Sequence, residues 1–335
     1  MNRSKVLEKS VRELVRIFRA APSPHHAHER SRQVLRDLSG SKASLNAALE
    51  LEIRRPGGLS TRNFPAIGIT IVNTPYFGLV ANCFLPGLPG EAGVTANSIH
   101  HHGHMLLTTV TTFGPGYEHW RFTTPKLIDA EREVFSMKLL DREQHSVDHV
   151  AFVDEFIPHA VVVPPSLTVT FALWSSRHKV TWREHVKRLP LIRGREHVLR
   201  RVATRLGLAK RLAINTVRYF DYYPVREGFK GMKDRVQFER GPNADFLCSL
   251  FHVLQTTNNE DLARVIEERT RVGERVDNPD TLVRLLADLR AGRPISSRLS
   301  EGIHRLEHMN FSTSAIERTL AALDATSTTG YSASA

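Results

Sequence analysis

The sequence predicts an α+β fold, in which an antiparallel β-barrel is flanked by an N-terminal helical segment and a C-terminal helical domain. Two changes in the pattern of residues along the chain indicate this class. In the region 51–180, short runs rich in β-branched and aromatic residues alternate with turn residues, which is typical of antiparallel sheets. On both sides of this region, apolar residues recur at three- and four-residue spacing, which is typical of amphipathic helices.

The chain is therefore expected to have four parts. The helical segment covers residues 1–50, the barrel residues 51–180, the helical domain residues 181–324, and a disordered tail of small polar residues 325–335.

Two local expectations follow at the N-terminal end. The first helix ends near Ala21, where the stretch PSPHH interrupts it, so we expect His25, His26 and His28 to lie in a loop. The segment LNAALELEIR, at 45–54, is predicted to be the first strand of the barrel.

Composition narrows the class of protein. Hydrophobic residues make up 41% of the chain and charged residues 24%, as in ordinary globular proteins. There is no apolar run of about eighteen residues and no apolar core near the start, so we expect neither a membrane span nor a secretory signal. The two cysteines, Cys83 and Cys248, lie far apart, which favours a cytoplasmic protein without disulfides. Any metal must then be held by nitrogen and oxygen ligands.

Positive charge is concentrated in one segment. The net charge is +11, and residues 177–240 carry 18 Lys and Arg against 6 Asp and Glu. This segment is either a set of solvated helix faces or a docking surface for an acidic carrier protein or a nucleic acid.

The stretch SIHHHGH, at 98–104, is the strongest chemical signal. On a strand, residues two apart point to the same side, so His100 and His102 would aim two imidazoles at one point. One more ligand from a neighbouring strand would complete a three-coordinate metal site with open positions for substrate. His104 has the same parity and could replace one of the pair, whereas His101 points to the other side.

His159 is the predicted third ligand. It follows Pro158 and opens a strongly β run, and strands this far apart in sequence can be neighbours in a small barrel. His145 and His149 compete for the role, but they stand among charged residues in DREQHSVDH and are predicted to lie in a loop.

The residues of this region resemble the two motifs of the cupin superfamily, with a spacing most similar to the cysteine dioxygenase branch. The first motif is carried by Ile99, His100, His102, Gly114, Glu118 and Phe122, and the second runs from His159 to Trp174 and Ser175.

This resemblance implies a β-barrel that holds one iron(II) ion on His100, His102 and His159. Leu106 and Leu107 stand where many cupins have a glutamate ligand, which favours the three-histidine form.

The resemblance also implies further residues at the site. Trp174 falls where the dioxygenases have a tyrosine near the iron, and Glu118 becomes a carboxylate beside the metal or facing the substrate. With His104, these are the predicted catalytic residues.

The predicted function is a mononuclear non-haem iron(II) oxygenase that acts with dioxygen on a small anionic or chelating molecule, with other divalent metals possible in the site. Two alternatives remain open. One is a non-catalytic cupin that senses or binds a partner through the basic segment, and the other is a metal-dependent cupin isomerase or lyase that needs no oxygen.

Overall fold

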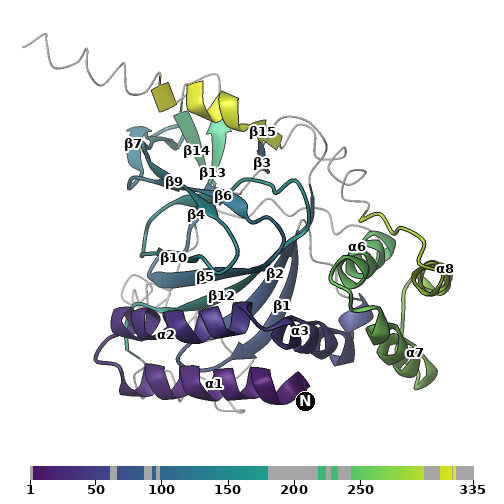
Figure 1. The fold of residues 1–335 in the computed structure, drawn as a ribbon. Helices are drawn as coiled ribbons and strands as arrows, with labels where there is room; N and C mark the ends of the chain where they lie inside the picture. The colour runs from purple at the N-terminus through teal and green to yellow at the C-terminus, as the bar shows by residue number, and fades with distance from the viewer. Residues whose placement is uncertain are drawn as a thin grey trace, which may run out of the picture.

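A computed structural model describes residues 3–60, 66–86, 93–95, 99–179, 218–223, 228–232, 243–297, 310–318 and 320–321. Within these residues the predicted α+β class is confirmed, because antiparallel sheets lie between N-terminal and C-terminal helices (Figure 1). The described residues do not include 180–217, which is most of the basic segment, or the tail 325–335. The predicted domain boundaries remain predictions.

Three helices open the chain: α1 (Arg3–Ala20), α2 (Pro24–Ser39) and α3 (Lys42–Arg54). The expected loop at His25, His26 and His28 is wrong, because these residues form the first turns of α2. Ser23 caps that helix by accepting a hydrogen bond from the backbone N–H of His26, and proline follows at the first helical position. Serine followed by proline therefore starts a helix here instead of only ending one.

The strand expected at 45–54 is also wrong, since this stretch belongs to α3. Its sequence fits both periods. Leu49, Leu51 and Ile53 alternate as on a strand, whereas Leu45, Leu49 and Ile53 share one helical face. The helical face is the buried one, and Leu51 is left 39% exposed.

A five-stranded antiparallel sheet covers these helices (Figure 1). Its order is β1 (Ala66–Asn73), β2 (Gly78–Phe84), β12 (Thr168–Ser176), β5 (Met105–Phe113) and β10 (Val150–Val153). One face packs its apolar side chains against the helices, and on the other face Thr109 and Thr111 contact His145 of the second sheet.

A second, eight-stranded sheet carries the predicted metal ligands. Its order is β7 (Lys126–Asp129), β8 (Val134–Ser136), β14 (Gly228–Met232), β13 (Arg218–Tyr223), β4 (Ile99–His101), β11 (His159–Val161), β6 (Tyr117–Phe122) and β9 (Leu139–His145). A separate pair joins β3 (Gly93–Thr95) to β15 (Asn310–Ser312).

Two segments of this sheet differ from the sequence prediction. The region after residue 181 was expected to be helical, yet β13 and β14 form a hairpin that pairs with β4 and β8. His145, expected in a loop, is the last residue of β9.

The two sheets face each other, and among the described strands they form two sheets instead of one closed ring. Rings of Phe84 and Tyr117 meet across the interior, with centroids 5.2 Å apart. At one edge Arg121 of β6 donates to both carboxylate oxygens of Asp141, at 2.8 and 2.9 Å, and to the carbonyl oxygen of Phe152 on β10, at 3.1 Å. This guanidinium therefore links β9 to the other sheet.

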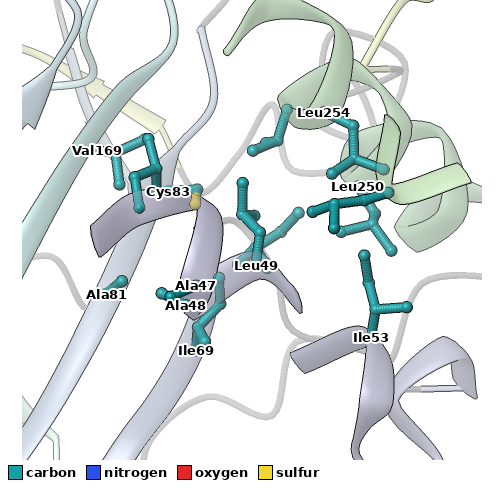
Figure 2. Packing of buried hydrophobic residues seen from close by; sticks show 14 of the residues in the cluster. Ala47, Ala48, Leu49, Ile53, Ile69, Ala81, Cys83, Val169, Leu250 and Leu254 are labelled. Atoms are coloured by element: carbon teal, nitrogen blue, oxygen red, sulfur yellow. The ribbon is translucent and has the colours of Figure 1, made fainter. Parts of the chain in front are cut away.

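The C-terminal helices are α6 (Asn243–Thr256), α7 (Ala263–Arg271) and α8 (Pro279–Arg290), and short 3-10 helices lie at Gly58–Ser60 and Glu260–Leu262. Leu250 and Leu254 of α6 belong to the same buried cluster as Leu49 and Ile53 of α3 (Figure 2). None of the described helices combines the length and the apolar character that a membrane crossing requires.

Candidate metal centre

The short strand β4 positions the first two histidines. His100 lies opposite His159 of β11 in register, so the two side chains project from the same face of the sheet. His102 comes directly after β4, and Gly103 then turns the chain with a φ of 62°. A left-handed residue of this kind is easily supplied by glycine, which explains why the strand ends at this point.

The structure brings His100, His102 and His159 together as the sequence predicts. One ring nitrogen from each lies within 4.8 Å of the others. The ring centroid of His100 lies 4.7 Å from the ring centroids of both His102 and His159, and the ring centroids of His102 and His159 are 5.0 Å apart. His159 is 3% exposed, whereas His100 and His102 are partly exposed. The cluster, called the histidine triad below, is therefore open on one side.

A backbone hydrogen bond selects the free nitrogen of His159. Its Nδ1 lies 3.1 Å from the carbonyl oxygen of Ile157, and a carbonyl oxygen can only accept. Nδ1 must therefore carry the hydrogen, which leaves the lone pair on Nε2. Histidine ligands of protein metals are commonly held in this way.

Burial keeps two members of the triad, His102 and His159, uncharged. It lowers the pKa of His102 to about 3, with His100 and His101 adding to the effect. Burial also lowers the pKa of His159 well below its ordinary value, helped by His100 and His102. Neutral imidazoles offer the lone pairs that metal binding needs, so the donor set fits a divalent metal.

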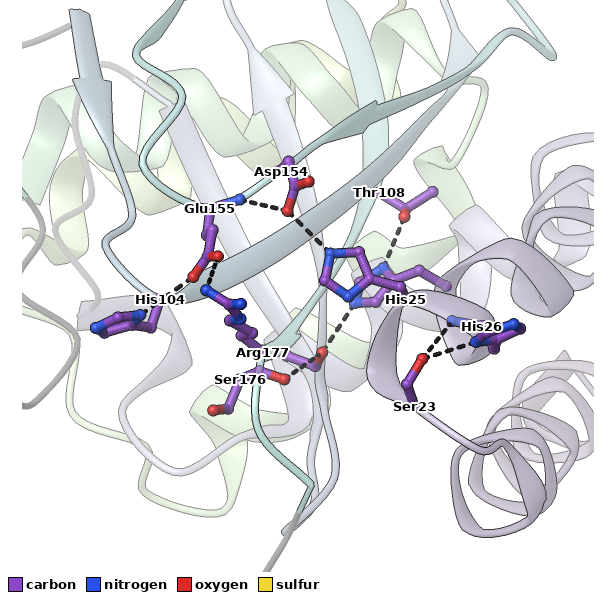
Figure 3. A network of polar contacts seen from close by, with 11 residues as sticks. Ser23, His25, His26, His104, Thr108, Asp154, Glu155, Ser176 and Arg177 are labelled. Carbon is purple, nitrogen blue, oxygen red and sulfur yellow. Dashed lines mark hydrogen bonds and ion pairs between the residues drawn. The ribbon is translucent and has the colours of Figure 1, made fainter. Parts of the chain in front are cut away.

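The loop that carries His159 is tied down by polar contacts (Figure 3). Asp154 accepts a hydrogen bond from His25 of α2 at 3.0 Å. Glu155 pairs with Arg177, and its other oxygen lies 3.1 Å from Nδ1 of His104. These contacts hold the segment between β10 and β11 against α2 and the end of β12.

His104 is therefore placed at Glu155 and outside the triad. Gly103 interrupts the strand, so the parity that His104 would share with His100 and His102 does not continue through the turn. His101 does point away from the triad, as expected. Its Nδ1 accepts from the N–H of Gly103 at 3.0 Å, and its ring contacts Phe156 and Phe220.

The two other predicted catalytic residues are not brought to the triad. Arg121 lies opposite His159, so Glu118, an odd number of residues away on β6, projects from the other face. There Glu118 accepts from Nε1 of Trp120 at 2.8 Å. Trp174 lies in the five-stranded sheet, and its ring leaves no room for a side chain at Gly78.

One residue near the triad was missed as a site residue. His119 was not among the residues predicted for the site, yet its ring centroid lies 5.4 Å from that of His159 at an interplanar angle of 81°. It is 3% exposed, and burial lowers its pKa to about 3. The sequence signal was the alternation of β6, which puts Tyr117, His119 and Arg121 on one face.

Of the two competing histidines, His145 lies beside His119, with ring centroids 6.4 Å apart, and His149 lies beside His145, with ring centroids 5.6 Å apart. His145 stacks on Tyr117, with ring centroids 4.9 Å apart at 14°, and its nitrogens lie 2.7 Å from the hydroxyls of Thr109 and Thr111. Nε2 of His149 lies 2.7 Å from Glu143. Neither belongs to the triad.

Comparison with known proteins finds solved structures of weak similarity. No family model matches the chain, and the search of curated proteins returned no match. Among solved structures, similar ones include cupin and double-stranded β-helix proteins. An uncharacterized conserved protein with a double-stranded β-helix domain from Klebsiella pneumoniae has 12% identity and a TM-score of 0.22, over 36% of this chain and 84% of the other.

Two more similar structures complete the comparison. A cupin superfamily protein from Desulfitobacterium hafniense has 8% identity and a TM-score of 0.22, over 35% of this chain and 82% of the other. Fe(II)-HppE with an alternative substrate has 18% identity and a TM-score of 0.20, over 32% of this chain and 48% of the other. Because these TM-scores are below 0.5, the likenesses add nothing to what the chain's own geometry supports.

Proposed function

We propose that this chain is a cupin-type metalloenzyme that binds one iron(II) ion through His100, His102 and His159. In this proposal it oxidises a small anionic or chelating molecule with dioxygen. The observation that carries the proposal is the convergence of three imidazole nitrogens within 4.8 Å in the space between the two sheets. A purely nitrogen donor set suits iron(II), and copper, nickel or zinc could occupy it in a purified sample.

When bound, iron would supply neighbouring coordination positions for the substrate and dioxygen. The chain's own residues decide which substrate could enter. Imidazole ligands bring no negative charge and would leave the charge of a bound divalent metal uncompensated, so an anionic group would be attracted to the centre. His100 and His102 are partly exposed and leave an approach from solvent, whereas buried His159 closes the far side. The carbonyl of Ile157 holds the imidazole of His159 in one orientation.

Metal analysis tests the proposed ligands. We expect the full-length protein to hold close to one equivalent of a divalent metal and His159→Ala to hold none, while the far-ultraviolet circular dichroism of the two is alike. His252→Ala is the matched control, because His252 also contacts a carbonyl oxygen, that of Ile295 at 2.8 Å, but lies in α6. A full equivalent of metal in His159→Ala would show that the ligand assignment is wrong.

Oxygen uptake tests the reaction class. The iron(II)-loaded protein is mixed with a panel of small carboxylic acids, enols and thiols, and dioxygen consumption is followed with an electrode. We expect uptake with at least one anionic member and none with His159→Ala. Turnover that continues without dioxygen would favour an isomerase or lyase. Bound metal without turnover in either condition would favour a binding protein.

A further inference from the structure

His119 is a buried group with an unused hydrogen-bonding atom. Its side chain is 3% exposed, and Nδ1 has no hydrogen-bond partner among the described residues. A buried polar atom without a partner is costly, and such atoms in native structures call for a specific explanation.

His145 of β9, whose ring centroid lies 6.4 Å from that of His119, cannot supply that partner. The hydroxyl of Thr111 donates to the carbonyl oxygen of His145 at 2.9 Å, so toward Nδ1 of His145 it can only accept. Nδ1 of His145 therefore carries the hydrogen, and Nε2 accepts from Thr109. Both nitrogens of His145 are engaged.

Two further polar neighbours among the described residues already have hydrogen-bond or ion-pair partners. Tyr117 hydrogen-bonds to Thr109. Glu143, which lies opposite His119 in register on β9, is 2.7 Å from His149. On the other side of His119, the register partner is Val161 of β11, which has no polar side-chain atom.

The triad lies on the remaining side of His119. His119 projects from the same face of the sheet as His159, because Arg121, two residues further along β6, is the register partner of His159. The ring of His119 stands edge-on to that of His159 with centroids 5.4 Å apart. It is not a member of the group of nitrogens within 4.8 Å, so among the described residues it flanks the triad without completing it.

We propose that His119 is a substrate-binding residue whose Nδ1–H donates a hydrogen bond to an anionic atom of the molecule bound at the triad metal. The ligand class is a small anion or a chelating oxygen donor, such as a carboxylate or an enolate. This inference rests on the proposed metal centre and adds to it the group that would hold the substrate.

Azide binding to the cobalt(II)-loaded full-length protein tests this role apart from turnover. Visible absorption of cobalt gives the azide dissociation constant, and elemental analysis gives the metal content. We expect His119→Phe to keep the metal and to bind azide about tenfold or more weakly, since a hydrogen bond to a charged ligand is lost. His119→Asn should recover part of the affinity, because its amide nitrogen stands near the position of Nδ1.

Tyr117→Phe is the matched control, since it disturbs the same buried cluster without touching the proposed contact. We expect its azide affinity to equal that of the wild type. Unchanged azide affinity in His119→Phe would overturn the role of His119 while the metal centre stands. Loss of cobalt from His119→Phe would overturn it too, by making His119 a ligand or a structural support. Absence of cobalt binding by the wild type would overturn both proposals.

Discussion

At the scale of single residues, His28 shows what a buried histidine does outside the histidine triad. It lies in α2, is 1% exposed, and contacts the hydroxyls of Thr108 at 2.7 Å and Ser175 at 2.9 Å. Both ring nitrogens are thus satisfied by the five-stranded sheet. Because burial lowers its pKa to about 3, the ring stays neutral while it joins helix to sheet.

This residue makes folding stability depend on pH. Unfolded His28 binds a proton below a pKa of about 6.5, whereas folded His28 does so only below about 3. The unfolded state therefore holds the extra proton between these values, and stability falls as pH falls. Urea unfolding with EDTA present should show that lowering the pH from 7.5 to 5 costs the wild type about 2 kcal/mol more than His28→Gln.

The exposed His26 of the same helix provides the control for this measurement. His26→Gln should follow the wild-type dependence on pH. If His28→Gln also follows the wild type, then His28 is not a buried neutral group in the folded protein.

Residue-level prediction worked where one regular element decided the geometry. The alternation of a strand was enough to pair His100 with His102, and a β-rich segment opening at His159 supplied the third histidine of the triad. Prediction was less accurate where the alternation of side chains between the two faces of a strand had to be followed through a turn or along β6. The turn at Gly103 takes His104 out of the strand, and Glu118 lies on the outer face of β6 while His119 lies on the inner one.

At the scale of elements, the turn Gly114-Pro115-Gly116 sets the start of β6. Gly114 has a φ of 87°, and a Cβ there would lie 2.0 Å from the carbonyl oxygen of Leu167. Gly116 has a φ of 83°, and a Cβ there would lie 2.2 Å from the carbonyl oxygen of His145. Both glycines are needed for the conformation and also for the close approach of neighbouring strands.

Replacing Gly114 should therefore be severe. Gly114→Ala combines left-handed strain with a backbone clash, and we expect a loss of about 3 kcal/mol or more in unfolding free energy. Gly273 has a similar φ of 92° with open space around the Cβ position, so Gly273→Ala should lose only about 1–2 kcal/mol. Melting temperatures of the two variants give the comparison, and equal losses would contradict the clash.

Element types were predictable except where two patterns competed or where partners came from far along the chain. In α3 the sequence fits both an alternating and a helical period, and packing against the sheet selects the helix. Strands β13 and β14 follow a basic stretch whose apolar residues have helical spacing, and the prediction extended the helical domain over them. In the structure they pair with β4 and β8, which are far away in the sequence.

At the scale of the whole molecule, helices from both ends of the chain share one core with the five-stranded sheet. Leu250 of α6 is fully buried in the cluster that also holds Leu49 and Val169 (Figure 2). The sequence predicted the order of helical segment, β-rich region and helical domain along the chain. It did not predict their common core, because contacts between distant segments leave no periodic signal.

A shared core should unfold as a unit. Leu250→Ala should lower stability by about 2–5 kcal/mol. The transition seen by far-ultraviolet circular dichroism should shift together with that seen by fluorescence of the tryptophans, which include Trp120 and Trp174 of the sheets. Leu140→Ala, at a position 53% exposed, should leave both transitions in place. A helix signal that melts early while the fluorescence is unchanged would show that the helices fold separately.

The position of β4 within its sheet also affects when the triad can form during synthesis of the chain. This strand is only three residues long, and its neighbours are β11 and β13, which the ribosome makes much later. A strand so short gains little until both neighbours are present, because distant pairings must first overcome the entropy of closing the intervening chain. A nascent chain that stops after β12 would contain all three histidines but lack β13, one of the two strands that pair with β4. Under the proposed function, metal uptake should therefore follow the completion of synthesis, so that an unfinished copy would not bind the ion.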